Sequence, residues 1–153
     1  MPDANTKLEI MELFSKYLLC LDERRFDAES FSEVFTENAE VIMPSKMLPL
    51  RECHGLKEIR EIHAALFRMI KSSHHMSGDY IFISLSEQSA EVRCNLSSCY
   101  NSFEPESSNT LITGTANFSA MNTSEGWRIQ RMLRKSKSVY SFGITTKNQE
   151  EFI

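Results

Sequence analysis

The sequence lacks a long apolar run and has little glycine or proline. Its longest unbroken apolar stretch, Tyr17 to Leu21, has five residues, whereas a membrane-spanning helix needs about 20. Glycine and proline together supply only 9 of 153 residues, which excludes collagen-like and low-complexity classes. The N-terminal segment MPDANTK lacks the apolar stretch of a signal peptide. We therefore expect a cytoplasmic protein that does not associate with a membrane.

The sequence has only four cysteines, and its 17 lysines and arginines are outnumbered by 21 acidic residues. The four cysteines have neither CxxC spacing nor the spacing of a disulfide framework, so we expect reduced thiols that pack as small hydrophobes: Cys20, Cys53, Cys94 and Cys99. The net charge of −4 argues against a nucleic-acid partner. The basic segment 128–137 carries no interleaved aromatic residues, so it does not change that expectation.

Motifs for cofactors and metals are missing as well. The sequence contains no glycine-rich phosphate loop, nucleotide fingerprint or G-x-S-x-G elbow. Cys53, His54 and His63 match no known metal-ligand spacing. We therefore expect no cofactor and no metal site.

The residues that are present suit one globular domain. A chain of 153 residues with 41% hydrophobic residues is long enough to bury one core. We expect a single domain over residues 1–153, with an ordered core of about residues 6–142 and a C-terminal tail over residues 143–153.

Helical periodicity dominates the first half of the chain. Thr6 and Glu9 form a capping box that predicts a helix start at Thr6. One face of this helix then carries Met11, Phe14, Leu18 and Asp22. A short second helix is expected with Asp27 or Ser30 as its N-cap. A third helix follows Gly55, with apolar residues at helical spacing: Ile59, Ile62, Leu66 and Ile70.

Strand periodicity dominates the second half. One short strand is expected earlier, over residues 38–43, followed by an irregular stretch up to Gly55. From Ser73 onward the hydrophobic period changes to two, over residues 73–85, 89–103, 110–121 and 127–140. Three helices followed by a meander of antiparallel strands predict an α+β fold, in which a strongly curved sheet and the helices form a cone with an open end.

Asp22 and the pair His74 and His75 are the first candidates for chemistry. Asp22 lies in the last turn of the first helix, where burial and the negative end of the helix dipole oppose its ionised form. A general base is usually a neutral imidazole that a neighbouring carboxylate orients. Adjacent strand residues point to opposite faces, so only one of the two histidines can join such a site. The alternative is that the helix ends near Cys20 and Asp22 is solvated.

Several motifs together resemble a known family. They are Tyr17-x4-Asp22, the segment RFDAESFSEVFTENAEV at residues 25–41, Gly55 before the third helix, HMSGD at residues 75–79 and GWRI at residues 126–129. The chain resembles the nuclear-transport-factor-2-like superfamily, and within it the SnoaL-like group that includes scytalone dehydratase and hexachlorocyclohexane dehydrochlorinase. The resemblance covers nearly the whole chain and implies the cone-shaped fold.

The resemblance also implies site residues. In those two enzymes a His-Asp dyad serves as the base, and its positions match Asp22 and His75, with Asp79 four residues after the histidine. The second acid-base histidine of scytalone dehydratase has no counterpart, because no histidine follows His75. That difference argues against dehydration of scytalone itself.

Two further residues are candidates for substrate binding. Tyr17 lies five residues before Asp22, so its hydroxyl is placed to bind a substrate carbonyl, or else it packs against the core. Arg131 shares the parity of Trp127, Ile129 and Leu133, so regular alternation points it inward, toward an anionic substrate group or an enolate. A β-bulge or an exposed strand end would turn it outward instead.

We therefore predict a cofactor-independent lyase or isomerase of dehydratase type that acts on a small apolar or cyclic molecule. The alternative is a non-catalytic protein of the same fold that binds a hydrophobic ligand or serves as a dimerisation platform. A third possibility is a subunit of a larger enzyme. Sheet pairing is common in the superfamily, and we expect a homodimer whose contact surface includes Met76, Tyr80 and Phe82.

Overall fold

The computed structural model describes residues 4–45, 48–103 and 109–142. The tail expected over residues 143–153 lies outside these ranges. Within these ranges there are three helices and six strands: α1 (Ala4–Asp22), α2 (Ala28–Ser32), β1 (Phe35–Ser45), β2 (Leu48–His54), α3 (Leu56–Phe67), β3 (Ile70–Leu85), β4 (Ser89–Ser102), β5 (Asn109–Thr123) and β6 (Gly126–Phe142). None of the described helices combines the length and the apolar character that crossing a membrane requires.

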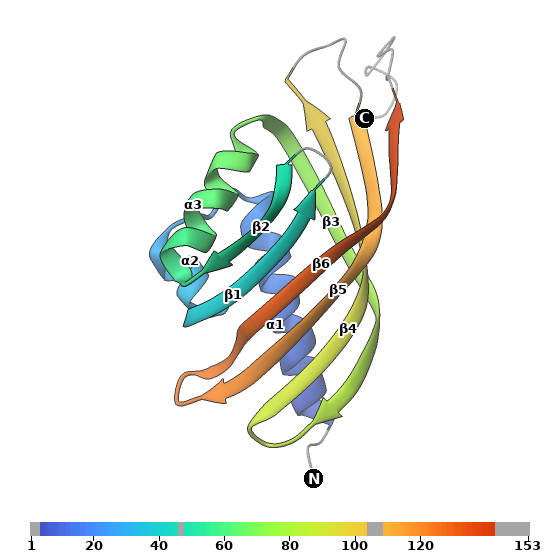
Figure 1. The fold of residues 1–153 in the computed structure, drawn as a ribbon. Coiled ribbons are helices and arrows are strands. Elements are labelled where there is room, and N and C mark those ends of the chain that lie inside the picture. The colour runs from blue at the N-terminus through green and yellow to red at the C-terminus, as the bar shows by residue number, and fades with distance from the viewer. Residues whose placement is uncertain (1–3, 46–47, 104–108, 143–153) are drawn as a thin grey trace, which may run out of the picture.

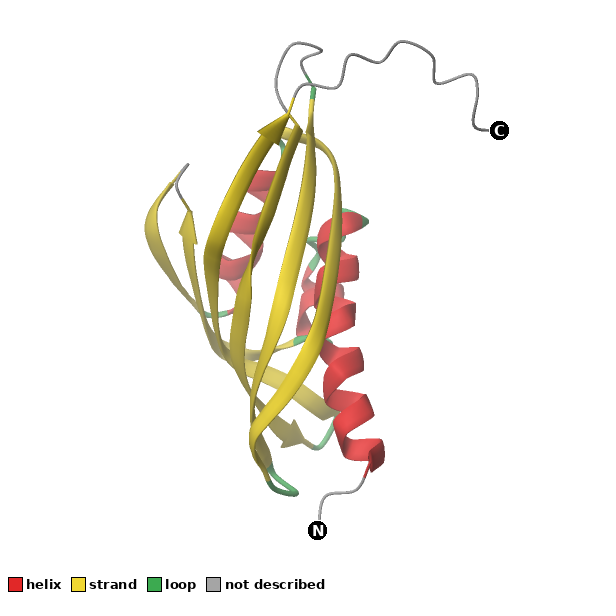
Figure 2. Cartoon of the chain, turned by 90° about the vertical axis from the view of Figure 1, so that its right-hand side faces the viewer, coloured by secondary structure: helices red, strands yellow, loops and turns green. Residues whose placement is uncertain are grey.

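The six strands form one curved sheet in the order β2-β1-β6-β5-β4-β3, and the helices lie on one side of it (Figure 1). Neighbouring strands pair antiparallel, except that β1 and β6 are parallel. Figure 2 shows α1 running along the long strands. The predicted α+β class is therefore confirmed, with a mixed sheet that does not close.

The helices and the meander lie where the sequence patterns predict them, but several element ends differ and one strand was not predicted. Asp27 is the N-cap of α2, where its carboxylate accepts a hydrogen bond of 2.8 Å from the Ser30 amide. The first helix begins at Ala4 rather than Thr6, and Ile70 begins β3 rather than ending the third helix. The stretch interpreted as irregular is the strand β2, which pairs with a β1 longer than expected.

A β-bulge in β3 exchanges the two faces of that strand. Gly78 pairs with Asn95 and Ile81 with Arg93, so β3 has one residue more than β4 between these pairs. Asp79 adopts the left-handed conformation there, with φ of 52°. Beyond this bulge Tyr80 faces the core and Ile81 is 58% exposed. The expectation that Tyr80 and Phe82 face outward is wrong, because strict alternation does not hold across a bulge.

A second bulge lies in β6 and changes which arginine faces inward. Ile129 and Arg131 pair with consecutive residues of β5, which leaves one residue of β6 unpaired. Ile129 and Met132 are fully buried, whereas the side chain of Arg131 is 62% exposed and lies 3.6 Å from the Glu40 carboxylate. The prediction from strand alternation that Arg131 and Leu133 point inward is therefore wrong.

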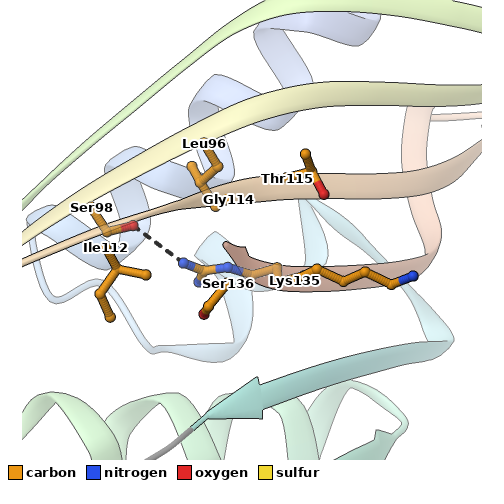
Figure 3. Close-up of a pocket in the computed structure, with 8 residues that line it drawn as sticks. Leu96, Ser98, Ile112, Gly114, Thr115, Lys135 and Ser136 are labelled. Atoms are coloured by element: carbon orange, nitrogen blue, oxygen red, sulfur yellow. Dashed lines mark hydrogen bonds between the residues drawn. The ribbon is translucent and has the colours of Figure 1, made fainter. Parts of the chain in front are cut away.

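The register of β5 and β6 shifts once more at Gly114. A Cβ atom on Gly114 would lie 1.9 Å from the carbonyl oxygen of Lys135, on the neighbouring strand (Figure 3). Only glycine fits there, because a real Cβ contact does not come that close. The approach brings Lys135, the residue after Arg134, tightly against β5.

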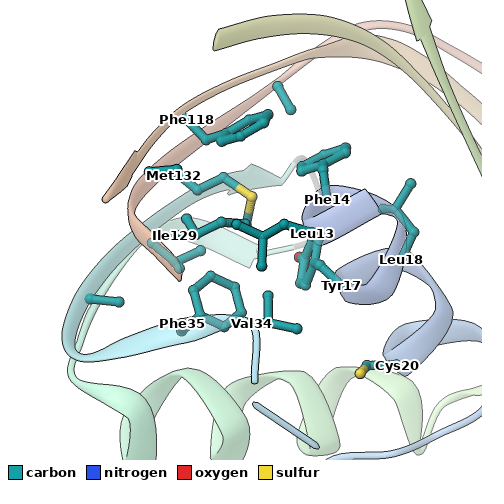
Figure 4. Packing of buried hydrophobic residues seen from close by; sticks show 14 of the residues in the cluster. Leu13, Phe14, Tyr17, Leu18, Cys20, Val34, Phe35, Phe118, Ile129 and Met132 are labelled. Atoms are coloured by element: carbon teal, nitrogen blue, oxygen red, sulfur yellow. The ribbon is translucent and has the colours of Figure 1, made fainter. Parts of the chain in front are cut away.

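The core lies between the helices and the inner face of the sheet (Figure 4). The ring of Phe14 on α1 stacks on that of Phe118 on β5, with centroids 4.9 Å apart. Tyr17, one turn later, packs edge-on against Phe35 of β1. These contacts fix the position of α1, and its last turn reaches the start of β3. None of the four cysteines, all within the described ranges, forms a disulfide bond, and Cys20, Cys53 and Cys94 are buried.

Candidate functional site

The end of α1 and the start of β3 bring together Asp22 and His75, the two residues predicted as a dyad. The Asp22 Oδ1 lies 2.6 Å from the His75 Nδ1. The carboxylate also accepts hydrogen bonds of 2.9 Å from the backbone amide of His75 and from the Ser73 hydroxyl. These three hydrogen bonds engage both carboxylate oxygens and fix the orientation of the group. Only 19% of the Asp22 side chain is exposed.

The hydrogen bonds of His75 determine its tautomer. Its Nδ1–H donates to Asp22, so Nε2 is the acceptor, and the Tyr100 hydroxyl donates to it over 3.1 Å. Burial of the side chain, followed by the charge of Arg134, lowers the pKa of His75 to about 4, against the raising effect of Asp22. His75 is therefore neutral at pH 7, with a lone pair on Nε2.

His74 lies on the other face of β3. Its side chain is 70% exposed, and its Nδ1 is 4.0 Å from Asp22. The structure thus distinguishes the two histidines that parity left undecided. The His74 side chain points to solvent, although it lies next to His75 in the chain.

Tyr17 lies deeper in the core than a substrate-binding residue is expected to lie. It is fully buried, and its hydroxyl is 2.9 Å from Nε2 of His63 on α3. Nδ1–H of His63 donates to the Ile59 carbonyl over 2.6 Å, so Nε2 is the acceptor and the Tyr17 hydroxyl donates to it. Burial raises the pKa of Tyr17. The hydroxyl therefore has an interior partner rather than a surface one.

Arg134 on β6 takes the interior place that the sequence pattern assigned to Arg131. One guanidinium nitrogen donates to the Tyr17 hydroxyl and another to the Ser98 hydroxyl, each over 3.4 Å. Burial lowers the pKa of Arg134, but the neighbouring Tyr17 and Tyr100 side chains together raise it above its ordinary value. Sequence reasoning missed Arg134 because the bulge in β6 inverts the parity after Ile129, and no glycine or proline marks that bulge.

Tyr100 links the two groups. Its hydroxyl contacts Nε2 of His75, and Tyr100 lies near enough to Arg134 to raise the pKa of that guanidinium. The alternation of β4 places Tyr100 on the inner face, and this is the only signal for it in the sequence. A polar chain therefore runs through the interior from Asp22 and His75, through Tyr100 and Arg134, to Tyr17 and His63.

A second arginine fixes the backbone around the dyad. Arg24 has a positive φ of 60° and donates to the carbonyl oxygens of Ile70 and Leu21 over 3.1 and 3.3 Å. Its guanidinium lies 4.7 Å from the centroid of the Phe67 ring. These contacts connect the end of α1 to the end of α3 and the start of β3, the junction at which Asp22 meets His75.

The cavity beside Arg134 is small. Its volume of about 20 Å³ accommodates a single water-sized group, and it is lined by Leu96, Ser98, Ile112, Gly114, Thr115, Arg134, Lys135 and Ser136. Among the described residues, no group of three His, Cys, Asp or Glu side chains is placed to hold a metal ion.

Comparison with protein families identifies the fold. The family model for the SnoaL-like domain matches residues 2–133. The search of curated proteins found no match.

Solved structures with the same fold have low sequence identity. A putative scytalone dehydratase from Novosphingobium aromaticivorans is 15% identical, with a TM-score of 0.76 over 93% of each chain. A type 2 hexachlorocyclohexane dehydrochlorinase, LinA, is 14% identical, with a TM-score of 0.80 over 95% of each chain. The Kfla4162 protein from Kribbella flavida is 20% identical, with a TM-score of 0.78 over 90% of this chain and 95% of that one.

Proposed function

The chain belongs to the SnoaL-like domain family, and from this premise we propose that it is a small-molecule lyase or isomerase that uses Asp22 and His75 as a general base. The observation that carries the proposal is the buried 2.6 Å contact between the two side chains. Structural neighbours described as a dehydratase and a dehydrochlorinase support the reaction class.

In the proposed reaction, Nε2 of His75 takes a proton from a substrate carbon next to an activating or leaving group. The C–H electron pair forms a new double bond as the leaving group departs, or forms an enolate that is reprotonated at another carbon. Asp22 stabilises the imidazolium that results and keeps the proton-accepting nitrogen in place. His75 then returns the proton to the leaving group or to the enolate. We expect the substrate to be small and apolar or cyclic, and the chain's own residues to supply the acid-base chemistry.

Tyr100 has to move for this reaction, because its hydroxyl covers Nε2 of His75. A change of its side-chain rotamer would free Nε2 and place the hydroxyl beside an arriving substrate. The same contact favours the alternative function, in which the protein binds a ligand or forms an assembly without reaction.

The experiment that distinguishes the two functions is a substrate panel. The purified protein is incubated in D₂O with small cyclic alcohols, halides and ketones that bear an acidic C–H bond, and products are followed by NMR. The proposal predicts elimination, isomerisation or deuterium wash-in above the buffer rate with no added cofactor. If substrates bind without turnover or exchange, the ligand-binding function replaces it.

We further propose that the protein acts in the cytoplasm as a homodimer. Three exposed apolar side chains on the outer face of β3 support pairing: Met76, Ile81 and Ile83, which are 51, 58 and 66% exposed. They replace the surface expected from the sequence, of which only Met76 faces outward. Light scattering at micromolar concentration should give the mass of two chains, and the Ile83→Arg variant should give that of one. A monomeric wild-type protein would contradict the proposal.

A further inference from the structure

Arg134 is a cation inside the fold that is held by neutral groups. Its guanidinium donates to the hydroxyls of Tyr17 and Ser98, and the dashed line in Figure 3 marks the contact with Ser98. Both histidines of the same network are neutral, because their pKa values are lowered to about 4 by burial first and by Arg134 next among the lowering effects. The interior network therefore contains two charges, Arg134 and Asp22.

These two charges do not pair with each other directly. Both oxygens of Asp22 are occupied by His75 and Ser73. In the described part of the chain, no carboxylate oxygen lies within 4 Å of the Arg134 guanidinium. A cation that is partly removed from water usually has an anionic partner, since hydroxyl dipoles only partly replace its hydration.

The cavity provides room for such a partner. Ser98, which contacts the guanidinium, and Ser136 line it together with Arg134, and its volume of about 20 Å³ fits a single oxygen of a ligand rather than a whole molecule. An arginine donates charge-assisted hydrogen bonds to a carboxylate oxygen, and flanking hydroxyls add further donors. Arg134 lies near enough to His75 for its charge, after burial, to lower the pKa of that imidazole, so a ligand held at the guanidinium would lie near the base.

We propose that Arg134, with Ser98 and Ser136, forms an anion subsite that binds the carboxylate of an organic acid. The proposal rests on the proposed function in one respect: it names the substrate class for the base at His75 as a small carboxylic acid. The bound carboxylate would orient the substrate and balance the charge of Arg134. The exposed Arg131, on the same strand, has no part in the subsite.

The test compares carboxylates with their neutral amides. Acetate and benzoate, and separately acetamide and benzamide, are titrated into the ¹⁵N-labelled full chain, and the Nε–H signal of Arg134 is followed. That signal is assigned as the one lost in the Arg134→Lys variant. We expect at least one carboxylate to shift it and to bind about tenfold more tightly than its amide, because the amide lacks the charge-assisted bonds.

Matched variants locate the effect. The Arg134→Met variant should reduce the preference for carboxylate over amide to about one, and Arg131→Met should leave it unchanged. The same loss in Arg131→Met would mean that the preference comes from general surface charge, and would overturn the proposal. So would an equal affinity of wild-type protein for carboxylates and amides. If Arg134→Met does not fold, the wild-type shift of the Arg134 signal still decides.

The experiments distinguish a failure of the anion subsite from a failure of the proposed lyase. A carboxylate preference that depends on Arg134, without turnover of any carboxylic acid, would support the subsite and contradict the lyase. Turnover of neutral substrates alone, with no shift of the Arg134 signal by either carboxylate, would support the lyase and overturn the subsite.

Discussion

Replacing His75 with alanine should lower kcat for the reaction found in the substrate panel by about 10⁴-fold, because the variant lacks the proton acceptor. The wild-type side chain is positioned by one carboxylate and one hydroxyl, at 2.6 and 3.1 Å from its two nitrogens. Little of the base's activity can be replaced by water, because the His75 side chain is fully buried. Single-turnover NMR or absorbance assays at saturating substrate give the comparison.

The Asp22→Asn variant separates two roles of the carboxylate, the orientation of the His75 ring and the stabilisation of its positive charge. The asparagine has the same shape and retains an oxygen for the His75 Nδ1–H, but it lacks the charge that stabilises the imidazolium. We expect kcat to fall by roughly 10³-fold while substrate affinity changes little.

The matched control is His74→Ala, which removes the neighbouring imidazole from the outer face of the same strand. It should retain wild-type kcat. Circular dichroism and thermal unfolding of all three variants verify folding, and His75→Gln offers a less disruptive replacement where alanine leaves a hole. Turnover that survives both His75 variants would place the base elsewhere and would contradict the dyad.

Local signals pointed to Asp22 and to the histidine pair, and the family resemblance then selected His75 over His74. Asp22 is a carboxylate on an apolar helix face, and His75 is a histidine at the start of an alternating strand. Their contact requires only that the end of the first helix lies near the start of the first long strand, which the family resemblance implied. The long strands were predictable for a similar reason, since their period of two continues over many residues.

Arg134, by contrast, could not be located from periodicity. The prediction of Arg131 assumed that alternation continues from Trp127 through β6, and one extra residue before Arg131 reverses the faces. The bulge in β3 reversed Tyr80 and Ile81 in the same way. A bulge depends on how two strands fit each other, so it is determined by tertiary packing and leaves little trace in either strand alone. The missed strand β2 has a related cause, because its seven residues form a strand only against β1.

Lowering the pH from 7 to 4.5 should reduce the free energy of unfolding by roughly 2 kcal/mol for each of the two buried histidines. In the folded protein burial is the largest effect that lowers the pKa values of His63 and His75, each to about 4 from the ordinary value of 6.5. Between these values the unfolded chain binds protons that the folded chain excludes. The linkage therefore makes stability rise with pH over this window, and the loss occurs as the pH falls from about 6.5 toward 4.

Urea unfolding at pH 7, 6, 5 and 4.5 measures the effect while most exposed carboxylates remain ionised. The His63→Gln variant isolates one contribution. Its absolute stability should be lower, because it disturbs the contacts with Tyr17 and Ile59, but the loss between pH 7 and 4.5 should be about half that of the wild type. His74→Gln, on the exposed face, should retain the full loss. Equal stability of the wild type at pH 7 and 4.5 would show that both imidazoles accept protons within the fold, and that the interior accommodates two further charges beside Arg134.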